Sequence, residues 1–137
     1  MYYYQILRYS NYILIRELNL KTDTVIIGAG VIGLAIAREM SGKGQEVIIL
    51  ERNTRAGEET STRNSGVIHS GVYYPFGSNK ATLCVEGNRL LYEYARNRGV
   101  GHRNTGKLVV ATKPEEINAL ESLKEKGVKN NVKGLKL

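Results

Sequence analysis

A glycine pattern near the amino-terminal end of the sequence is the strongest candidate for a ligand-binding site. The pattern is Gly28-Ala29-Gly30-Val31-Ile32-Gly33, which follows a β-branched run and precedes an apolar helical stripe. In such a strand–turn–helix unit the first glycine permits a tight turn and the second lets the backbone approach a pyrophosphate, while the third allows close helix packing. The helix amino terminus offers free N–H groups and partial positive charge to phosphate oxygens. The pattern therefore predicts a dinucleotide diphosphate held by these residues, Ala29 included.

An acidic residue stands where the ribose of such a nucleotide would lie. Glu51 ends the next predicted strand, 21 residues after Gly30. A carboxylate at this point accepts hydrogen bonds from the adenosine ribose and repels the 2′-phosphate of NADP, so FAD or NAD is favoured. Arg52 follows directly and is a second candidate for contact with the nucleotide, where it would favour the 2′-phosphate of NADP, although a solvated arginine is the simpler interpretation.

A polar segment runs from residue 54 to residue 79, and more than half of it is Gly, Ser, Thr, Asn or Pro. A loop of that length inside a compact domain is uncommon and usually functional. An NAD-binding unit would continue promptly into another helix and strand, whereas hydroxyls, amides and bare glycine backbone suit the extended ligand FAD. His69 is the one histidine placed to act as a general base. The alternative is an imidazole that packs against flavin or hydrogen-bonds the backbone without proton transfer.

Apolar spacing predicts the elements that would position the glycine pattern and Glu51. Residues 24–27 and 47–50 are runs typical of strands buried on both faces of a parallel sheet. Between them an apolar stripe predicts a helix that Gly42 and Gly44 terminate. The sequence thus predicts an α/β fold with one Rossmann-like βαβ unit.

Three further elements are predicted beyond the polar segment. Helical spacing returns over residues 79–98, with Gly99 as the stop. Residues 107–111 are expected to form a strand. Thr112 and Glu115 have the spacing of a capping box, which predicts that a helix opens there.

Composition and charge exclude several classes of protein. With 42% apolar and 24% charged residues the chain is neither disordered nor low-complexity, and one cysteine cannot form an intramolecular disulfide. No apolar run approaches the roughly 20 residues of a membrane span. The net charge of +7 lies largely on lysines near the carboxyl end without any nucleic-acid-binding motif, so no nucleic-acid partner is expected. Cys84 and the two histidines form no metal-ligand cluster. We expect a soluble, cytoplasmic chain without a metal site.

Five stretches of sequence carry a resemblance to a known family. They are Asn64-Ser65-Gly66-Val67-Ile68-His69-Ser70-Gly71-Val72-Tyr73-Tyr74, Lys80-Ala81-Thr82-Leu83-Cys84-Val85-Glu86-Gly87, Leu90-Leu91-Tyr92-Glu93-Tyr94, Gly106-Lys107-Leu108-Val109-Val110 and Gly134-Leu135-Lys136-Leu137. With the glycine pattern, they resemble the D-amino-acid-oxidase-like superfamily of FAD-dependent oxidoreductases, and within it the L-2-hydroxyglutarate dehydrogenases (oxidases). The resemblance runs from about residue 23 to the last residue. Members are substantially longer, so the chain looks like an amino-terminal piece of such an enzyme.

The resemblance implies a cofactor, a reaction and roles for individual residues. Gly28, Gly30 and Gly33 would hold the FAD diphosphate and Glu51 the ribose. Along the diphosphate and ribityl chain would lie Thr60, Ser61, Asn64 and Ser65, while Gly66 and the residues up to His69 would approach the isoalloxazine. The implied reaction is oxidation of a small 2-hydroxy acid, L-2-hydroxyglutarate, to 2-oxoglutarate by hydride transfer to flavin. Tyr73 and Tyr74 would contact substrate or flavin, or pack in the core or a lid.

The resemblance also implies a division of the chain. Residues 1–22, which hold five tyrosines without a clear period and lack the Ser- and Arg-rich composition of a transit peptide, would be a non-family extension. Residues 23–99 would form the amino-terminal part of an FAD-binding domain that is incomplete, and residues 100–137 the truncated beginning of a substrate domain. Two alternatives stay open: a sibling flavoenzyme acting on another hydroxy acid, glycerol 3-phosphate or an amino acid, and a non-catalytic remnant. A missing carboxyl-terminal portion encoded separately is one explanation for the length.

Overall fold

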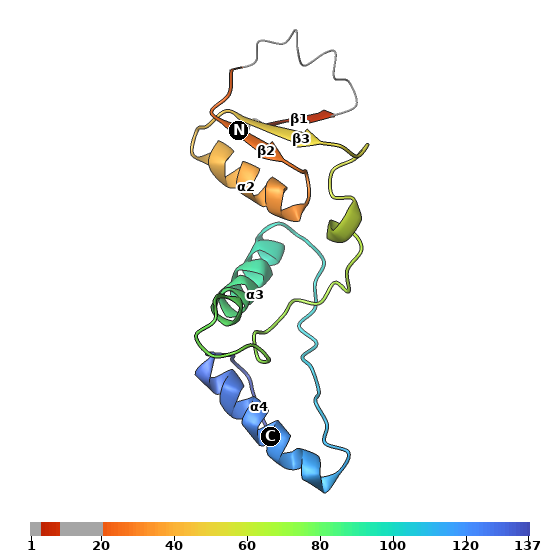
Figure 1. The fold of residues 1–137 in the computed structure, drawn as a ribbon, viewed down its shortest axis with the longest axis vertical. Coiled ribbons are helices and arrows are strands. Elements are labelled where there is room, and N and C mark those ends of the chain that lie inside the picture. The colour runs from red at the N-terminus through yellow and green to blue at the C-terminus, as the bar shows by residue number, and fades with distance from the viewer. Residues whose placement is uncertain (1–3, 9–20) are drawn as a thin grey trace. The chain divides into compact units, whose positions relative to one another are not determined.

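The computed structural model describes residues 4–8 and 21–137, and the chain divides into two compact units, Met1–Gly66 and Val67–Leu137 (Figure 1). The first unit contains strands β1 (Tyr4–Arg8), β2 (Thr24–Ile27) and β3 (Val47–Glu51), helix α2 (Val31–Gly42) and the 3-10 turn Glu59–Ser61. The second contains helices α3 (Asn79–Asn97) and α4 (Ile117–Lys129), with the 3-10 turn Pro114–Glu116 before α4. None of the described helices is long and apolar enough to cross a membrane.

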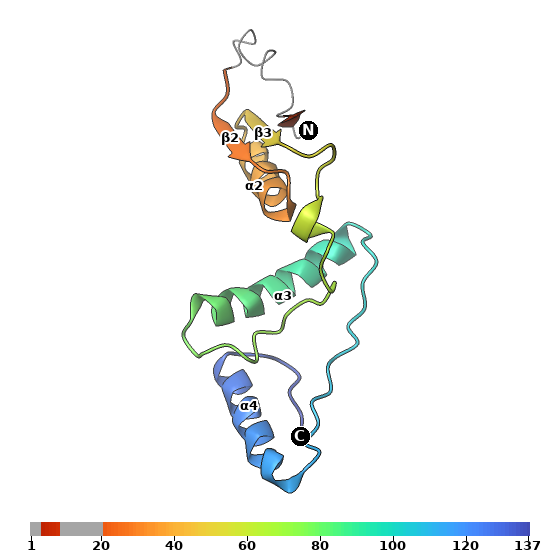
Figure 2. The ribbon, with the colours of Figure 1, turned by 45° about the vertical axis from the view of Figure 1, so that its right-hand side comes forward.

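The first unit is built around a parallel sheet in the order β1-β3-β2. The register aligns Thr24 with Val47 and Ile27 with Leu50. Helix α2 lies against one face of this sheet (Figure 2), where Ala37, Val47 and Ile49 form a buried cluster. The described residues therefore form a mixed α/β fold with a partial Rossmann-like unit, as predicted.

The opposite face of β2 is open among the described residues. Val25 is 53% exposed and Ile27 is 87% exposed, whereas Ile26 packs against the buried cluster. The prediction of a strand buried on both faces is therefore wrong for β2. The physical reason is that α2 covers only the face to which Ile26 belongs, and alternate residues of a strand point to opposite faces.

Strand β1 falls in a part of the chain that the sequence placed outside the fold. Tyr4–Arg8 pairs in parallel with β3 over five residues, from Tyr4 opposite Val47 to Arg8 opposite Glu51. A strand edge offers backbone N–H and C=O groups to any extended segment, so this pairing leaves no clear side-chain signature. Residues 1–3 and 9–20 of the expected extension lie outside the described residues, whereas the Thr22 hydroxyl donates to the Glu46 carbonyl at 2.7 Å.

The three α-helices of the described residues end in the same way, with a left-handed residue after which two backbone N–H groups donate back to carbonyls of the last helical turn. The left-handed residues are Gly44, Gly99 and Asn131, with φ of 85°, 65° and 62°. After α4, the Asn131 N–H donates to the Val128 carbonyl and the Val132 N–H to the Gly127 carbonyl, both at 2.9 Å. This is the Schellman pattern, and it confirms the stops predicted at Gly44 and Gly99.

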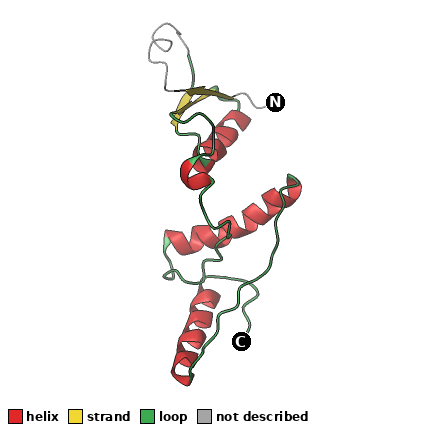
Figure 3. Cartoon of the chain, turned by 90° about the vertical axis from the view of Figure 1, so that its right-hand side faces the viewer, coloured by secondary structure: helices red, strands yellow, loops and turns green. Residues whose placement is uncertain are grey.

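The predicted strand over residues 107–111 is absent, and these residues belong to the loop between α3 and α4 (Figure 3). Leu108 is 85% exposed and Val110 is 62% exposed. An apolar run becomes a strand only when a partner supplies ladder hydrogen bonds, and no described segment pairs with this one.

The start of α4 is shifted from the predicted capping box. The Glu116 carboxylate, rather than that of Glu115, accepts the Thr112 N–H at 2.8 Å and the Thr112 hydroxyl at 3.1 Å. These two bonds, the backbone one foremost, hold the pKa of Glu116 below its ordinary value. The 3-10 turn at Pro114–Glu116 accounts for the shift, because it moves the first α-helical residue to Ile117.

Candidate nucleotide-binding site

The turn between β2 and α2 has a backbone conformation that requires glycine at two positions. Gly28 has a φ of +99°, and its N–H donates to the Leu50 carbonyl at 2.7 Å. A side chain at Gly33 has no room, since a Cβ there would lie 2.1 Å from the Gly28 carbonyl oxygen. Gly33 thus brings the first turn of α2 directly onto the end of β2.

The amino terminus of α2 presents backbone donors to an oxygen ligand. Gly30 is the N-cap, it provides no capping side chain, and the first turn of α2 contains no acidic residue. The Val31 N–H donates to the Ser61 hydroxyl oxygen at 2.9 Å, and a Cβ on Gly30 would lie 3.1 Å from that same oxygen. The Ser61 oxygen therefore occupies the acceptor position at the start of α2 and lies in the space that a side chain at Gly30 would fill.

Glu51 is tied to the glycine turn by charge-assisted hydrogen bonds. Its Oε2 accepts the Ala29 N–H at 2.7 Å and its Oε1 accepts the Asn53 N–H at 2.8 Å. The backbone bonds from Asn53 and then Ala29 lower the pKa of Glu51, outweighing burial, which acts in the opposite direction. The ionised carboxylate keeps further acceptor positions on both oxygens, which ribose hydroxyls can use. The role of Glu51 as a ribose ligand stays a prediction, and its bond to the Ala29 N–H was not predicted from the sequence.

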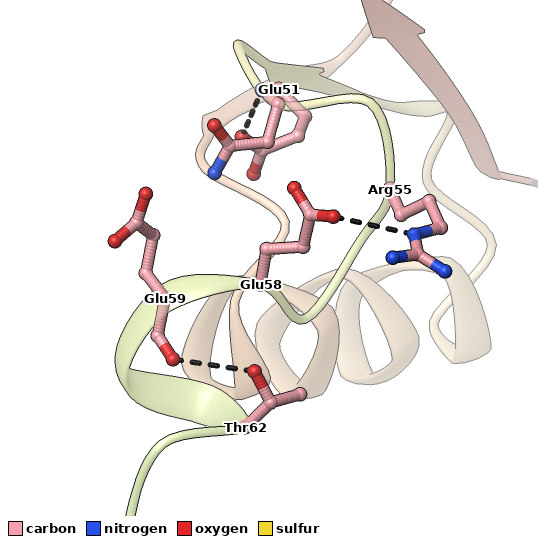
Figure 4. Close-up of polar contacts among 6 residues, drawn as sticks. Glu51, Arg55, Glu58, Glu59 and Thr62 are labelled. Carbon is pink, nitrogen blue, oxygen red and sulfur yellow. Dashed lines mark hydrogen bonds and ion pairs between the residues drawn. The ribbon is translucent and has the colours of Figure 1, made fainter.

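The segment after Glu51 folds back over the turn. The Gly57 N–H donates to the Ala29 carbonyl at 2.8 Å. Arg55 pairs with Glu58 at 3.3 Å, and the Thr62 hydroxyl donates to the Glu59 carbonyl at 3.3 Å (Figure 4). Arg52 is exposed, and its charge contributes least to lowering the pKa of Glu51.

The polar residues predicted along the diphosphate do not all lie at the glycine turn. Ser61 does, through its bond to Val31. Asn64 instead turns its amide nitrogen to the carbonyls of Thr60 at 3.2 Å and Ser61 at 3.1 Å, while its oxygen accepts the Gly66 N–H at 2.9 Å. Thr60 and Ser65 are exposed. The Asn64 side chain thus stabilises the loop in which it lies.

His69, the predicted catalytic residue, lies in the second unit and is exposed. Its Nδ1 lies 3.4 Å from the Tyr74 hydroxyl oxygen, and its backbone carbonyl accepts a hydrogen bond from the Asn88 amide at 3.1 Å. The sequence suggested Tyr74 as a contact for substrate or flavin but did not predict its contact with His69, because two residues five positions apart in a loop have no fixed geometry. Throughout residues 4–8 and 21–137, no three or more His, Cys, Asp or Glu residues are grouped to hold a metal ion.

Comparison with known proteins finds similarity over most of the chain. The family model of FAD dependent oxidoreductases matches residues 23–136. A curated relative, the mitochondrial L-2-hydroxyglutarate dehydrogenase of Arabidopsis thaliana, is 50% identical over 85% of this chain and 24% of its own length. The human protein of the same name is 46% identical over 84% of this chain and 25% of its own length. The Caenorhabditis elegans protein of that name is 40% identical over 85% of this chain and 28% of its own length.

These comparisons bear on two expectations from the sequence. The chain spans about a quarter of the length of the curated relatives it matches, which agrees with a partial enzyme chain. The relatives are named mitochondrial, and this contradicts the cytoplasmic location expected from composition. Composition alone cannot separate two aqueous compartments, which explains the error.

Proposed function

The chain belongs to the FAD dependent oxidoreductase family, and on that premise we propose that its first unit binds the adenosine diphosphate half of FAD. The observation that carries this proposal is the oxygen acceptor already bound at the amino terminus of α2. There the Val31 N–H already donates to an oxygen at 2.9 Å, and the first turn has no carboxylate to repel a phosphate.

The roles follow from the contacts of the first unit. Backbone N–H groups at the start of α2 would donate to the phosphates, helped by the positive end of the helix dipole. The Ser61 hydroxyl would either donate to a phosphate oxygen or be displaced by one from the Val31 N–H. Glu51 would accept from the adenosine ribose with the acceptor positions that Ala29 and Asn53 leave free. The flavin, when bound, supplies the hydride acceptor.

For the reaction, we propose oxidation of L-2-hydroxyglutarate to 2-oxoglutarate, with His69 as the general base of the site. Identities of 40–50% to proteins with that enzyme name support this choice of substrate. Because this chain spans a quarter of their length, the substrate, the reaction and a mitochondrial location are proposals for the enzyme to which these residues belong.

Calorimetric titration with ADP and with FAD tests the nucleotide proposal. Gly30→Val would place a branched side chain where the proposed site would hold the diphosphate, so we expect at least tenfold weaker binding of both ligands. Gly101→Val is the matched control, since a Cβ at Gly101 meets no atom within 4 Å and its backbone is not left-handed. Equal affinity of Gly30→Val and the parent chain would refute the site.

A further inference from the structure

The second unit holds His69 and Tyr74 on a loop that is anchored from two helices. The Asn88 amide of α3 donates to the His69 carbonyl at 3.1 Å. The Asn130 amide, just past α4, donates to the carbonyls of Gly71 at 3.1 Å and Tyr74 at 2.9 Å, and Asn130 is only 7% exposed. The backbone on both sides of the pair is therefore held by side chains that are distant in sequence.

Packing and charge further restrict the tyrosine. A Cβ on Gly71 would lie 2.8 Å from Val85 Cγ2, so the loop packs directly on α3. The Lys80 ammonium lies 4.5 Å from the centroid of the Tyr74 ring, within the range of a cation–π contact. Together with the 3.4 Å approach of the Tyr74 hydroxyl to Nδ1 of His69, these contacts place the two side chains within hydrogen-bonding distance.

We infer that the Tyr74 hydroxyl donates to Nδ1 of His69, so that the neutral imidazole carries its proton on Nε2. Two groups share this contact, and each could in principle donate. A phenol hydroxyl is a much stronger proton donor than a neutral imidazole N–H, and an imidazole nitrogen is a much stronger acceptor than a phenol oxygen. The ammonium of Lys80 on the ring face adds to this preference, because a nearby positive charge withdraws electron density from the phenol oxygen.

The direction of the Tyr74–His69 hydrogen bond determines how His69 can act as a base, a consequence that rests on the proposed function. A neutral imidazole has one free nitrogen lone pair, and here that lone pair faces Tyr74. A proton from the substrate hydroxyl therefore passes to the Tyr74 oxygen while the phenol proton passes to Nδ1, which leaves tyrosine neutral and His69 as imidazolium. The flavin, when bound, would supply the acceptor for the carbinol hydride, which balances the loss of the hydroxyl proton. Tyr74 is thus the residue that meets the hydroxyl, and His69 acts through it.

Nitrogen-15 NMR of the imidazole rings in the 137-residue chain tests the inference without cofactor or activity. The chain contains two histidines, His69 and His102. His102 is an internal reference, because its Nδ1 lies 2.7 Å from the Val100 carbonyl oxygen, which can only accept, so Nδ1 carries the proton. At a pH where both rings are neutral, we expect the opposite tautomers: Nε2–H for His69 and Nδ1–H for His102.

Two tyrosine variants make the test specific. Tyr74→Phe should move the His69 Nδ1 resonance toward the position of a free lone pair, while the His102 signals stay in place. Tyr73→Phe is the matched control, since Tyr73 also lies under a lysine, with the Lys107 ammonium 4.6 Å from its ring, and should leave His69 unchanged.

An Nδ1–H tautomer for His69 in the parent chain, or an Nδ1 resonance unmoved by Tyr74→Phe, would overturn the inference. If Tyr74→Phe did not fold, the Nδ1 shift of His69 in the parent chain would still decide, because a nitrogen that accepts a hydrogen bond differs in shift from one with a free lone pair. Nucleotide binding in the first unit is measured separately by calorimetry, so failure of the pair and failure of the proposed function are distinguishable.

Discussion

Substitution of Gly33 by alanine tests the packing that brings α2 onto β2. The new Cβ would lie 2.1 Å from the Gly28 carbonyl oxygen, 3.2 Å from the Gly28 carbonyl carbon and 3.3 Å from Ile26 Cγ2. The first two contacts are with backbone, so no side-chain rotation relieves them. The helix or the turn must move, and the turn is itself held by the bond from the Gly28 N–H to the Leu50 carbonyl.

The magnitude follows from two opposing effects. Overpacking a well-packed site costs about 1–3 kcal/mol, and the backbone clash places this change near the upper end. Alanine in a helix interior is favoured over glycine by about 1 kcal/mol. The net expectation for Gly33→Ala is a loss of about 2 kcal/mol in the free energy of unfolding of the first unit, which is a factor of about 30 in the unfolding equilibrium.

Gly87→Ala in α3 is the matched control, because the same change there meets no atom within 4 Å. This variant should gain up to about 1 kcal/mol from helix propensity alone. Urea unfolding followed by NMR at the amides of Ile49 and Ala95, which are buried in the first and second units, reports each unit separately. If Gly33→Ala left the Ile49 midpoint unchanged or raised it, the packing argument would be wrong.

Three further outcomes are expected. Because the pKa of Glu51 is lowered in the folded chain, its ionised carboxylate stabilises the fold fully above the ordinary value of 4.5, and this stabilisation fades as the pH falls through the lowered value. Glu51→Gln should therefore lower the free energy of unfolding at pH 7 by about 2 kcal/mol, seen as a lower melting temperature, and this deficit should shrink below pH 4.5. A deficit that does not change with pH would contradict the expectation. Asn130→Asp replaces a donor that serves two carbonyls and should cost about 3 kcal/mol, whereas Asn131→Asp, at an exposed left-handed position, should change stability by less than about 0.5 kcal/mol in the same urea assay. The 137-residue chain by itself should retain FAD poorly, because the described sheet leaves one face of β2 open. It should also show no bleaching of flavin absorption when L-2-hydroxyglutarate is added. Bleaching by a monomeric, FAD-loaded chain would contradict this prediction.

Much of the first unit could be predicted because local chemistry determines it. The β-branched residues of β2 and β3 favour strands, and Gly28, Gly33 and Gly44 sit where a left-handed turn or close backbone contact admits no side chain. These constraints act over a few residues and are visible in the sequence. The roles of the same residues toward a nucleotide stay predictions.

The features that sequence missed depend on partners distant in the chain. Leu108 and its neighbours have strand composition, but no described strand pairs with them. Tyr4–Arg8 lacks a strand pattern, yet the free edge of β3 pairs with it. The bond from Asn130 to Tyr74 spans 56 residues, and nothing in either segment marks it. Edge pairing and side-chain-to-backbone bonds of this kind follow from tertiary structure and have no local signature.

The central claim is that the turn at the start of α2 binds the diphosphate of a nucleotide. Titration of the nitrogen-15-labelled chain with ADP, followed through backbone amide shifts, tests it most directly. We predict shifts concentrated at Ala29, Gly30 and Val31, with Val31 the largest because its present bond is to the Ser61 hydroxyl. An absence of shifts at saturating ADP, or shifts confined to the lysine-rich residues 124–136, would contradict the claim.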